Sequence, residues 1–109
     1  MEIIFLETSL QGIQWMRRYY ARNPQLNAKK AFLSYKMTQK HIASTPPPKM
    51  TFEDFEDVWE AKIQNTAFSI LYTIRGNTLY IIDIRDQRGQ RSYLALKKYE
   101  AELRQKYLP

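Results

Sequence analysis

The sequence predicts an α+β fold in which a helical hairpin and a short C-terminal helix pack on one face of an antiparallel β-sheet. The first half of the chain has apolar residues at helical spacing, and the second half has β-branched and aromatic runs separated by a tight turn. Helical and strand patterns that stay in separate segments are typical of α+β proteins. With 109 residues, the chain is expected to form a single domain, residues 1–109.

The N-terminal half is predicted to hold one strand and two helices. Residues 1–7 contain four consecutive apolar residues and favour a strand. Ser9 is the expected N-cap of a first helix that ends near Arg22. Asn23-Pro24 is the expected start of a second helix, which ends before the prolines at 46–48. Because the connection is so short, the two helices should form an antiparallel hairpin.

The C-terminal half is predicted to hold three strands and a helix. The strands are expected at residues 58–63, 68–74 and 79–84, where β-branched and aromatic residues concentrate. Gly76-Asn77 suits a two-residue hairpin turn that needs positive φ at its first central position. Ser92 is the expected N-cap of the last helix.

The formal net charge of +6 points to a polyanionic partner, and the charges are segregated along the chain. Residues 1–50 carry eight Lys and Arg against two acids, and residues 75–109 carry eight against four. Residues 51–62 carry five acids and one lysine. This acidic stretch also contains aromatic residues, so we interpret it mainly as a structural segment that packs on the domain.

Composition excludes several kinds of site. The chain has no cysteine, so it has no disulfide and no thiolate ligand, and a single histidine, His41, cannot form a zinc site alone. No cofactor and no metal are therefore expected. No apolar run approaches the roughly 20 residues of a membrane span. A cytoplasmic protein without a membrane partner is the expectation.

One run of the sequence carries a resemblance to a known family: TAFSILYTIRGNTLYIIDIRDQRG, residues 66–89. It combines an "F-S/R-x-x-Y" strand, a tight turn, a second apolar strand and "D-Q-R". Together with the preceding strand and helical hairpin, this run resembles toxins of type II toxin–antitoxin modules, the RelE/ParE superfamily, over about residues 1–103. The similarity is greatest to the ParE-like, or plasmid-stabilisation, proteins. The resemblance implies a RelE/ParE-like fold and a cognate antitoxin that binds the toxin in a hetero-oligomer and neutralises it.

The resemblance implies two alternative activities. RelE-like members are ribosome-dependent, metal-independent endoribonucleases that cut mRNA, and ParE-like members inhibit DNA gyrase. Lys62, Arg88 and Tyr93 lie at or beside positions of the nuclease's catalytic residues. However, Glu60 stands where a second lysine is expected, and Ser69 stands where an arginine should contact the phosphate. We therefore favour the gyrase inhibitor, which is not an enzyme, and keep the nuclease as the alternative.

Two groups of residues are predicted to bind the target or the antitoxin. The first group is cationic and consists of Arg75, Arg85, Arg88 and Arg91. Guanidinium groups offer paired donors to phosphates or carboxylates. Alternatively, Asp83 and Asp86 neutralise the neighbouring arginines, and the segment is a structural ion-pair cluster.

The second group is apolar and belongs to the first helix. We predict that it forms part of a groove for an antitoxin helix, and it consists of Ile13, Trp15, Tyr19 and Tyr20. Ordinary core packing is the alternative for these four residues. Outside the toxins, a further alternative for the whole chain is a basic nucleic-acid-binding module, whose affinity would fall steeply with salt.

Overall fold

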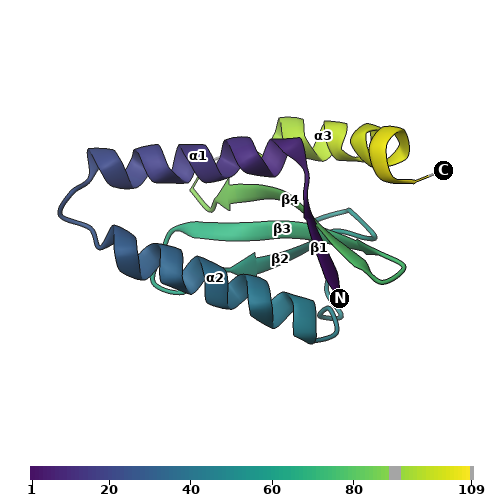
Figure 1. Ribbon diagram of the computed structural model, residues 1–109, viewed down its shortest axis with the longest axis horizontal. Coiled ribbons are helices and arrows are strands. Elements are labelled where there is room, and N and C mark those ends of the chain that lie inside the picture. Colours follow the sequence, from purple (N-terminus) through teal and green to yellow (C-terminus); the bar gives the residue numbers. More distant parts are fainter. Residues whose placement is uncertain (89–91, 109) are drawn as a thin grey trace.

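The structure, a computed structural model, describes residues 1–88 and 92–108 (Figure 1). The N-terminal elements are β1 (Glu2–Phe5), α1 (Glu7–Arg22) and α2 (Ala28–Ser44). The remaining elements are β2 (Trp59–Lys62), β3 (Phe68–Arg75), β4 (Thr78–Asp86) and α3 (Tyr93–Glu102), and α3 continues as a π-helical turn at Leu103–Tyr107. The predicted α+β class and element order are confirmed. In the described part of the chain, no helix is both long and apolar enough to cross a membrane.

The four strands form one mixed sheet in the order β1-β4-β3-β2. β2, β3 and β4 are antiparallel neighbours, and the predicted turn joins β3 to β4 with Gly76 at φ +61°. β1 pairs with β4 in parallel, with Glu2 opposite Thr78. The prediction of an antiparallel sheet was therefore wrong for β1. Two helices and two strands lie between β1 and β4, so no tight turn fixes their relative direction.

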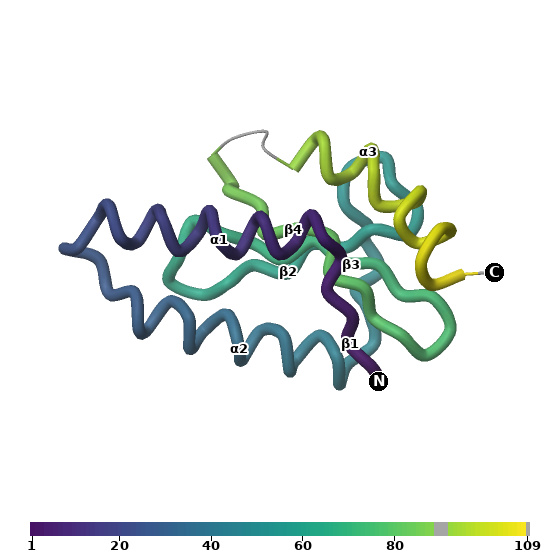
Figure 2. The backbone as a smooth tube through the Cα atoms, turned by 45° about the horizontal axis from the view of Figure 1, so that its top comes forward, coloured from purple at the N-terminus to yellow at the C-terminus, as the bar shows by residue number. Residues whose placement is uncertain are grey.

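Helices cover both faces of the sheet, which corrects the prediction that all helices lie on one face. Met16 of α1 and Tyr35 of α2 pack in one core with Phe68, Ile70 and other residues of the sheet. Ala95, Tyr99 and Leu103 pack in a second core on the opposite face, with Leu71 and Ile82. Figure 2 shows α1 and α2 as two arms of a hairpin and α3 apart from them. Because β3 and β4 are buried on both faces, their sequences are mostly apolar and do not alternate between apolar and polar residues.

Two predicted helix starts were wrong. α1 begins at Glu7, and the Ser9 hydroxyl donates a hydrogen bond to the carbonyl of Leu6 instead of capping the helix. α2 begins at Ala28, because the side chain of Asn27 accepts a hydrogen bond from the backbone N–H of Lys30. This is the usual N-cap bond, and it leaves Pro24 in the connecting turn. Ser92 precedes α3 as predicted, but its side chain makes no capping hydrogen bond.

α1 crosses closely over the outer edge of β4 beyond the end of β1. The Thr8 hydroxyl donates a 2.5 Å hydrogen bond to the carbonyl of Ile82. A Cβ atom on Gly12 would lie 2.9 Å from the backbone nitrogen of Ile84 and would collide with the carboxylate of Asp83. The absence of a side chain at Gly12 therefore allows α1 to pack closely against β4, and the rest of α1 continues toward the end of that strand.

Candidate functional site

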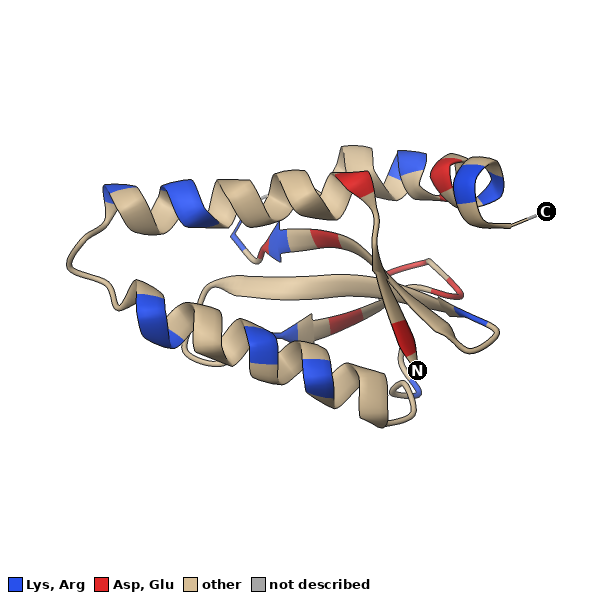
Figure 3. Ribbon diagram, viewed as in Figure 1, with Lys and Arg blue, Asp and Glu red and all other residues tan. Residues whose placement is uncertain are grey.

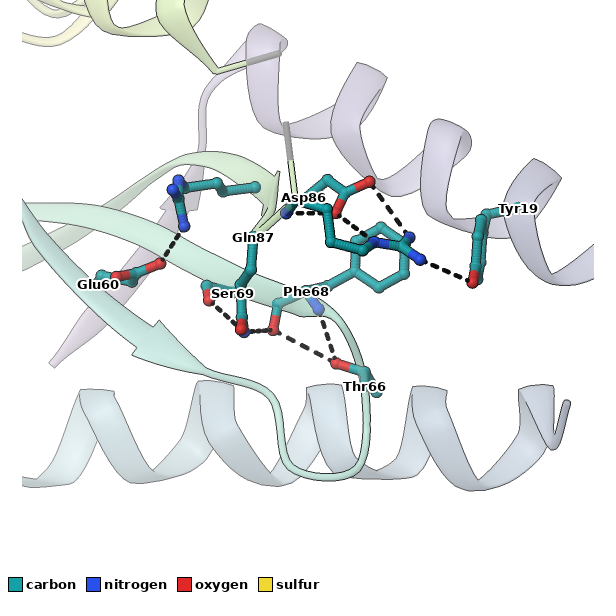
Figure 4. Close-up of polar contacts among 9 residues, drawn as sticks. Tyr19, Glu60, Thr66, Phe68, Ser69, Asp86 and Gln87 are labelled. Atoms are coloured by element: carbon teal, nitrogen blue, oxygen red, sulfur yellow. Dashed lines mark hydrogen bonds and ion pairs between the residues drawn. The ribbon is translucent and has the colours of Figure 1, made fainter. Parts of the chain in front are cut away.

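Arg88 follows the end of β4 and is held between Asp86 and a ring from α1. Its Nε and backbone nitrogen donate to Asp86 Oδ1 at 3.0 and 2.9 Å. Its Nη1 donates to the Tyr19 hydroxyl at 3.3 Å, and Cζ lies 5.0 Å from the centre of the Tyr19 ring. In Figure 4, Tyr19 projects from α1 toward the strand end that carries Asp86. The Arg88 side chain nevertheless remains 54% exposed, so it can still contact a partner.

The ion pair of Arg88 with Asp86 shifts the pKa of both groups. Partial burial acts to raise the pKa of Asp86, but hydrogen bonds and charge from Arg88 outweigh it and hold the pKa below 3.8. The hydrogen bond to Asp86, followed by that to Tyr19, raises the pKa of Arg88. Both groups are therefore charged across the physiological range, and Asp86 partly neutralises the cation that it positions.

Arg85 of β4 is neutralised by Glu60 of the edge strand β2, across the intervening strand β3. Its Nη1 donates to Glu60 Oε2 at 2.8 Å, and its guanidinium carbon lies 5.3 Å from the ring centre of Phe52. Glu60 is the residue that stands where the resemblance leads us to expect a lysine. The carboxylate at this position thus has an observed role, because it holds Arg85 against the sheet.

Ser69 lies between Lys62 and Arg85 in the strand register. Lys62 is opposite Ser69, which in turn is opposite Arg85, so the Cα atoms of Lys62 and Arg85 are about 10 Å apart across the sheet. Ser69 is fully buried, and its hydroxyl accepts a 2.9 Å hydrogen bond from the Gln87 side chain. Figure 4 shows this contact beside Glu60. The residue at the position expected to contact the phosphate is therefore buried and uncharged, and its hydroxyl is already hydrogen-bonded within the protein.

The three predicted catalytic residues come from three different elements. Lys62 is exposed on β2 and lines a hollow of about 450 Å³ between β2 and α2. Tyr93 is 59% exposed at the start of α3, where Lys97 lies 4.3 Å from the centre of its ring. Within residues 1–88 and 92–108, no hydrogen bond, ion pair or ring contact joins Lys62, Arg88 and Tyr93.

The four predicted binding arginines also separate. Arg85 and Arg88 lie near the same end of the sheet, whereas Arg75 lies at the β3–β4 turn. Arg75 donates to the carboxylates of Asp57 and Glu100, and Tyr99 donates to Asp57 at 3.2 Å. Burial acts to lower the pKa of Arg75, but these hydrogen bonds raise it. Arg91 lies outside the described residues.

The predicted apolar group on α1 divides between a groove and the core. Ile13 lines a groove of about 430 Å³ between α1 and α2. Trp15 and Tyr19 instead pack edge-on against Phe68, each with ring centres 5.3 Å apart, and Tyr20 is buried beside them.

Sequence reasoning missed the other residues of that groove. Besides Ile13, the groove is lined by Phe5, Leu10, Arg17, Phe32, Tyr35, Lys36, Gln39 and Lys40. Phe32, Lys36 and Lys40 are spaced four residues apart, so they lie along one face of α2. This spacing could have indicated that they line a common groove.

The acidic segment before β2 packs on the domain, as its aromatic residues predicted. Phe52 is 9% exposed and Val58 is fully buried. Asp57 binds Arg75, and Glu60 binds Arg85. Two of the five acids of residues 51–62 thus form ion pairs with structural roles, at two separate places.

Comparisons of the chain with family models, with curated proteins and with solved structures found no match.

Proposed function

We propose that this protein is the toxin of a type II toxin–antitoxin pair and that it inhibits DNA gyrase by binding it rather than by cutting RNA. The resemblance of residues 66–89 to RelE/ParE toxins is the starting point for the proposal. The observed order of elements, with a helical hairpin before three consecutive antiparallel strands, agrees with what that resemblance implies.

One observation favours gyrase inhibition over RNA cleavage: two arginines of the candidate site already form ion pairs with carboxylates of this chain. Arg85 is paired with Glu60 at 2.8 Å and Arg88 with Asp86 at 3.0 Å. Cleavage of an RNA phosphodiester needs cations that stabilise the charge developing on the phosphate. Glu60 and Asp86 would instead repel that charge, so the site is poorly suited to nuclease chemistry.

The same arrangement suits recognition of a protein. Arg88 is exposed, its orientation is fixed by Asp86 and Tyr19, and arginine beside an aromatic ring is common at the centres of protein interfaces. A pre-oriented side chain also loses less conformational entropy on binding than a free one. Arg88 and Tyr19 are therefore the proposed contacts with the target.

The groove between α1 and α2 is the proposed binding site of the antitoxin. Its floor includes Ile13 and Phe32, and its rim carries Arg17, Lys36 and Lys40. An amphipathic helix with acidic flanks would bury its apolar face on this floor and place its carboxylates beside the rim cations. Lys36→Glu/Lys40→Glu is expected to prevent rescue by the co-expressed cognate antitoxin while growth arrest by the toxin persists. Full rescue of this variant would exclude the groove.

The nuclease alternative rests on one observation, the exposed Lys62 in the strand row of Ser69 and Arg85. Lys62 has no ion pair within residues 1–88 and 92–108, so its charge is available to a phosphate.

Inducible expression in a bacterial host tests the two activities. Wild type would be compared with Arg88→Ala, Lys62→Ala and a control, Arg104→Ala, whose side chain is 79% exposed beyond α3. Growth, the DNA-damage response and mRNA integrity are measured together. We expect wild type, Lys62→Ala and the control to stop growth with a DNA-damage response and intact mRNA, and Arg88→Ala to be weaker.

If wild type cleaves mRNA and neither Lys62→Ala nor Arg88→Ala does, the nuclease activity would replace the gyrase proposal. Normal growth while soluble wild-type protein accumulates would overturn the toxin proposal itself.

A further inference from the structure

The positive charge of the protein is concentrated on the helical hairpin. From Thr8 to Phe52 the sequence has eight Lys and Arg and no acid, whereas the remaining residues have nine Lys and Arg and all eleven acids. In Figure 3, blue bands follow α1 and α2, while red appears on α1 only near its start. The hairpin, residues 7–44, carries seven of these cations and one acid, Glu7, so its net charge equals the +6 of the whole chain.

The cations of the hairpin are exposed and unpaired. Its seven Lys and Arg, and Lys49 beyond α2, are all exposed, and none forms an ion pair within the described ranges, 1–88 and 92–108. Elsewhere in these ranges, five cations do form ion pairs, namely Arg75, Arg85, Arg88, Arg104 and Lys106. Within the described residues, the hairpin cations therefore lack carboxylate partners, whereas most of the other cations have them.

Four of these cations lie where the two helices meet, a region that we call the hairpin tip: Arg18, Arg22, Lys29 and Lys30. Figure 1 shows the turn between α1 and α2 at one extreme of the molecule, which is 45 Å long and 27 × 24 Å across. The turn of the tip supplies the polar side chains of Gln25 and Asn27, and Leu26 is 39% exposed.

Electrostatics within the hairpin oppose this arrangement. Lys29 and Lys30 occupy the first turn of α2, where the positive end of the helix dipole favours acids, and that turn has no acidic residue. On the other side of the short connection, Arg22 adds a further cation in the last turn of α1. The fold gains no stability from four like charges at this place, but a bound anion would relieve all of them.

The cationic surface continues from the tip to Arg88. Lys30 and Tyr19 line the same hollow of about 440 Å³, together with Asn27 and Asn65. Tyr19 in turn contacts Arg88. Cations and neutral hydrogen-bonding groups thus form one continuous surface across this end of the molecule.

We propose that the hairpin tip binds the phosphate backbone of duplex DNA without reading its sequence. Phosphate contacts need cations and polar donors, both of which the tip presents. A stable protein interface buries about 1,000 Å² or more around an apolar centre. The apolar groove between α1 and α2 is separate from the tip, and Leu26 is the large apolar side chain that the connecting turn itself exposes. The proposal goes beyond the toxin function and does not depend on it.

The test is the binding of a fluorescent 20-base-pair DNA duplex by the full chain, followed by anisotropy at several salt concentrations. Four phosphate contacts predict a slope of about −3.6 for log K against log salt, which corresponds to about a 150-fold loss of affinity between 50 and 200 mM salt. Lys29→Gln/Lys30→Gln should weaken binding on the order of tenfold for each lost contact at 50 mM salt and reduce the slope by about 2.

Lys97→Gln/Lys98→Gln on α3 is the matched control, because it changes two exposed helical lysines and lowers the net charge equally. It should retain affinity and slope, and circular dichroism should show that both variants fold. Equal weakening by the two variants would mean that only net charge matters and would overturn the assignment to the tip. Failure to bind DNA at 50 mM salt, with tighter binding of poly-L-glutamate, would assign the tip to an acidic protein instead.

Discussion

The β3–β4 hairpin has an arginine at each end, and the two differ in their partners. Arg75, beside the turn, binds the carboxylates of Asp57 and Glu100, which are 18 and 25 residues away in the sequence. Arg88, beyond the end of β4, binds Asp86, which is only two residues away. The Arg75 side chain is 26% exposed, and that of Arg88 is 54% exposed.

The difference separates a structural arginine from a recognition arginine. The pairs of Arg75 connect the strand to the acidic segment and to α3, so they restrain elements that are distant in sequence. The pair of Arg88 with Asp86 is local, and the contact of Arg88 with Tyr19 of α1 is exposed. An arginine fixed by its own neighbour contributes little to folding but presents a defined surface to a partner.

The largest expected loss of stability comes from replacing the glycine near each end of the β3–β4 hairpin, Gly12 near Arg88 and Gly76 beside Arg75. Gly12→Ala should lower the free energy of unfolding by about 2 kcal/mol, since the new Cβ meets Ile84 and Asp83 and pushes α1 from β4. Gly76→Ala meets nothing within 4 Å and should cost about 1 kcal/mol, because φ is +61° there. Urea unfolding measures both. If the two variants are equally stable, the approach of α1 does not constrain the Arg88 end.

The arginines themselves should differ next. Arg75→Met leaves two partly buried carboxylates without their partner and should cost about 1.5 kcal/mol. Arg88→Met should cost less than about 0.5 kcal/mol, because its ion pair is local and exposed. Thermal unfolding of the two variants checks this order, and a larger loss for Arg88→Met would reverse the assignment of roles.

The Arg75 end should be the end sensitive to alkali. Burial raises the pKa of Tyr99 to about 12, with a further contribution from Asp57, against 10.0 in the unfolded chain. The protonated hydroxyl therefore stabilises the fold below pH 10, and this contribution is lost as the pH rises from 10 to about 12. The stability difference between wild type and Tyr99→Phe should shrink over this interval. A difference that is constant from pH 8 to 12 would contradict the shift.

The Arg88 end should respond to acid, with the smallest effect of the four. Arg88 holds the pKa of Asp86 below 3.8, so the charged carboxylate stabilises the fold above that pH and the contribution disappears as the pH falls further. Asp86→Asn should be less stable than wild type by under about 1 kcal/mol at pH 7. Chemical denaturation at pH 7 and pH 3 should show that the difference decreases in acid. An increase at pH 3 would mean that Asp86 has no stabilising cation.

The sequence predicted the elements of this fold better than their packing. The runs of β3 and β4 and the Gly76-Asn77 turn are local signals, because their residues dictate backbone conformation directly. The direction of β1 and the face covered by α3 depend on contacts with residues far away in the sequence. Helical spacing also could not separate Ile13, which lines the groove, from Trp15, which packs against Phe68.

The candidate site was predicted only in part. The arginines after β4 were identified from charge and position, and Asp86 was recognised as a possible neutralising partner. The pairing of Arg85 with Glu60 was not predicted, because it depends on which residues of β2 and β4 lie near each other across the sheet. The distant partners of Arg75 were missed for the same reason, since a single sequence contains no local signal for Asp57 and Glu100.

The parallel pairing of β1 with β4 also determines when the fold can be completed during protein synthesis. Glu2 is synthesised 76 residues before its strand partner, Thr78. Contacts of such long sequence separation form late, and domains generally fold as units. The helical hairpin, with its seven cations, therefore leaves the ribosome before the sheet that will support it exists. Binding partners that need α1 and α2 in their final positions must wait until most of the chain has been made.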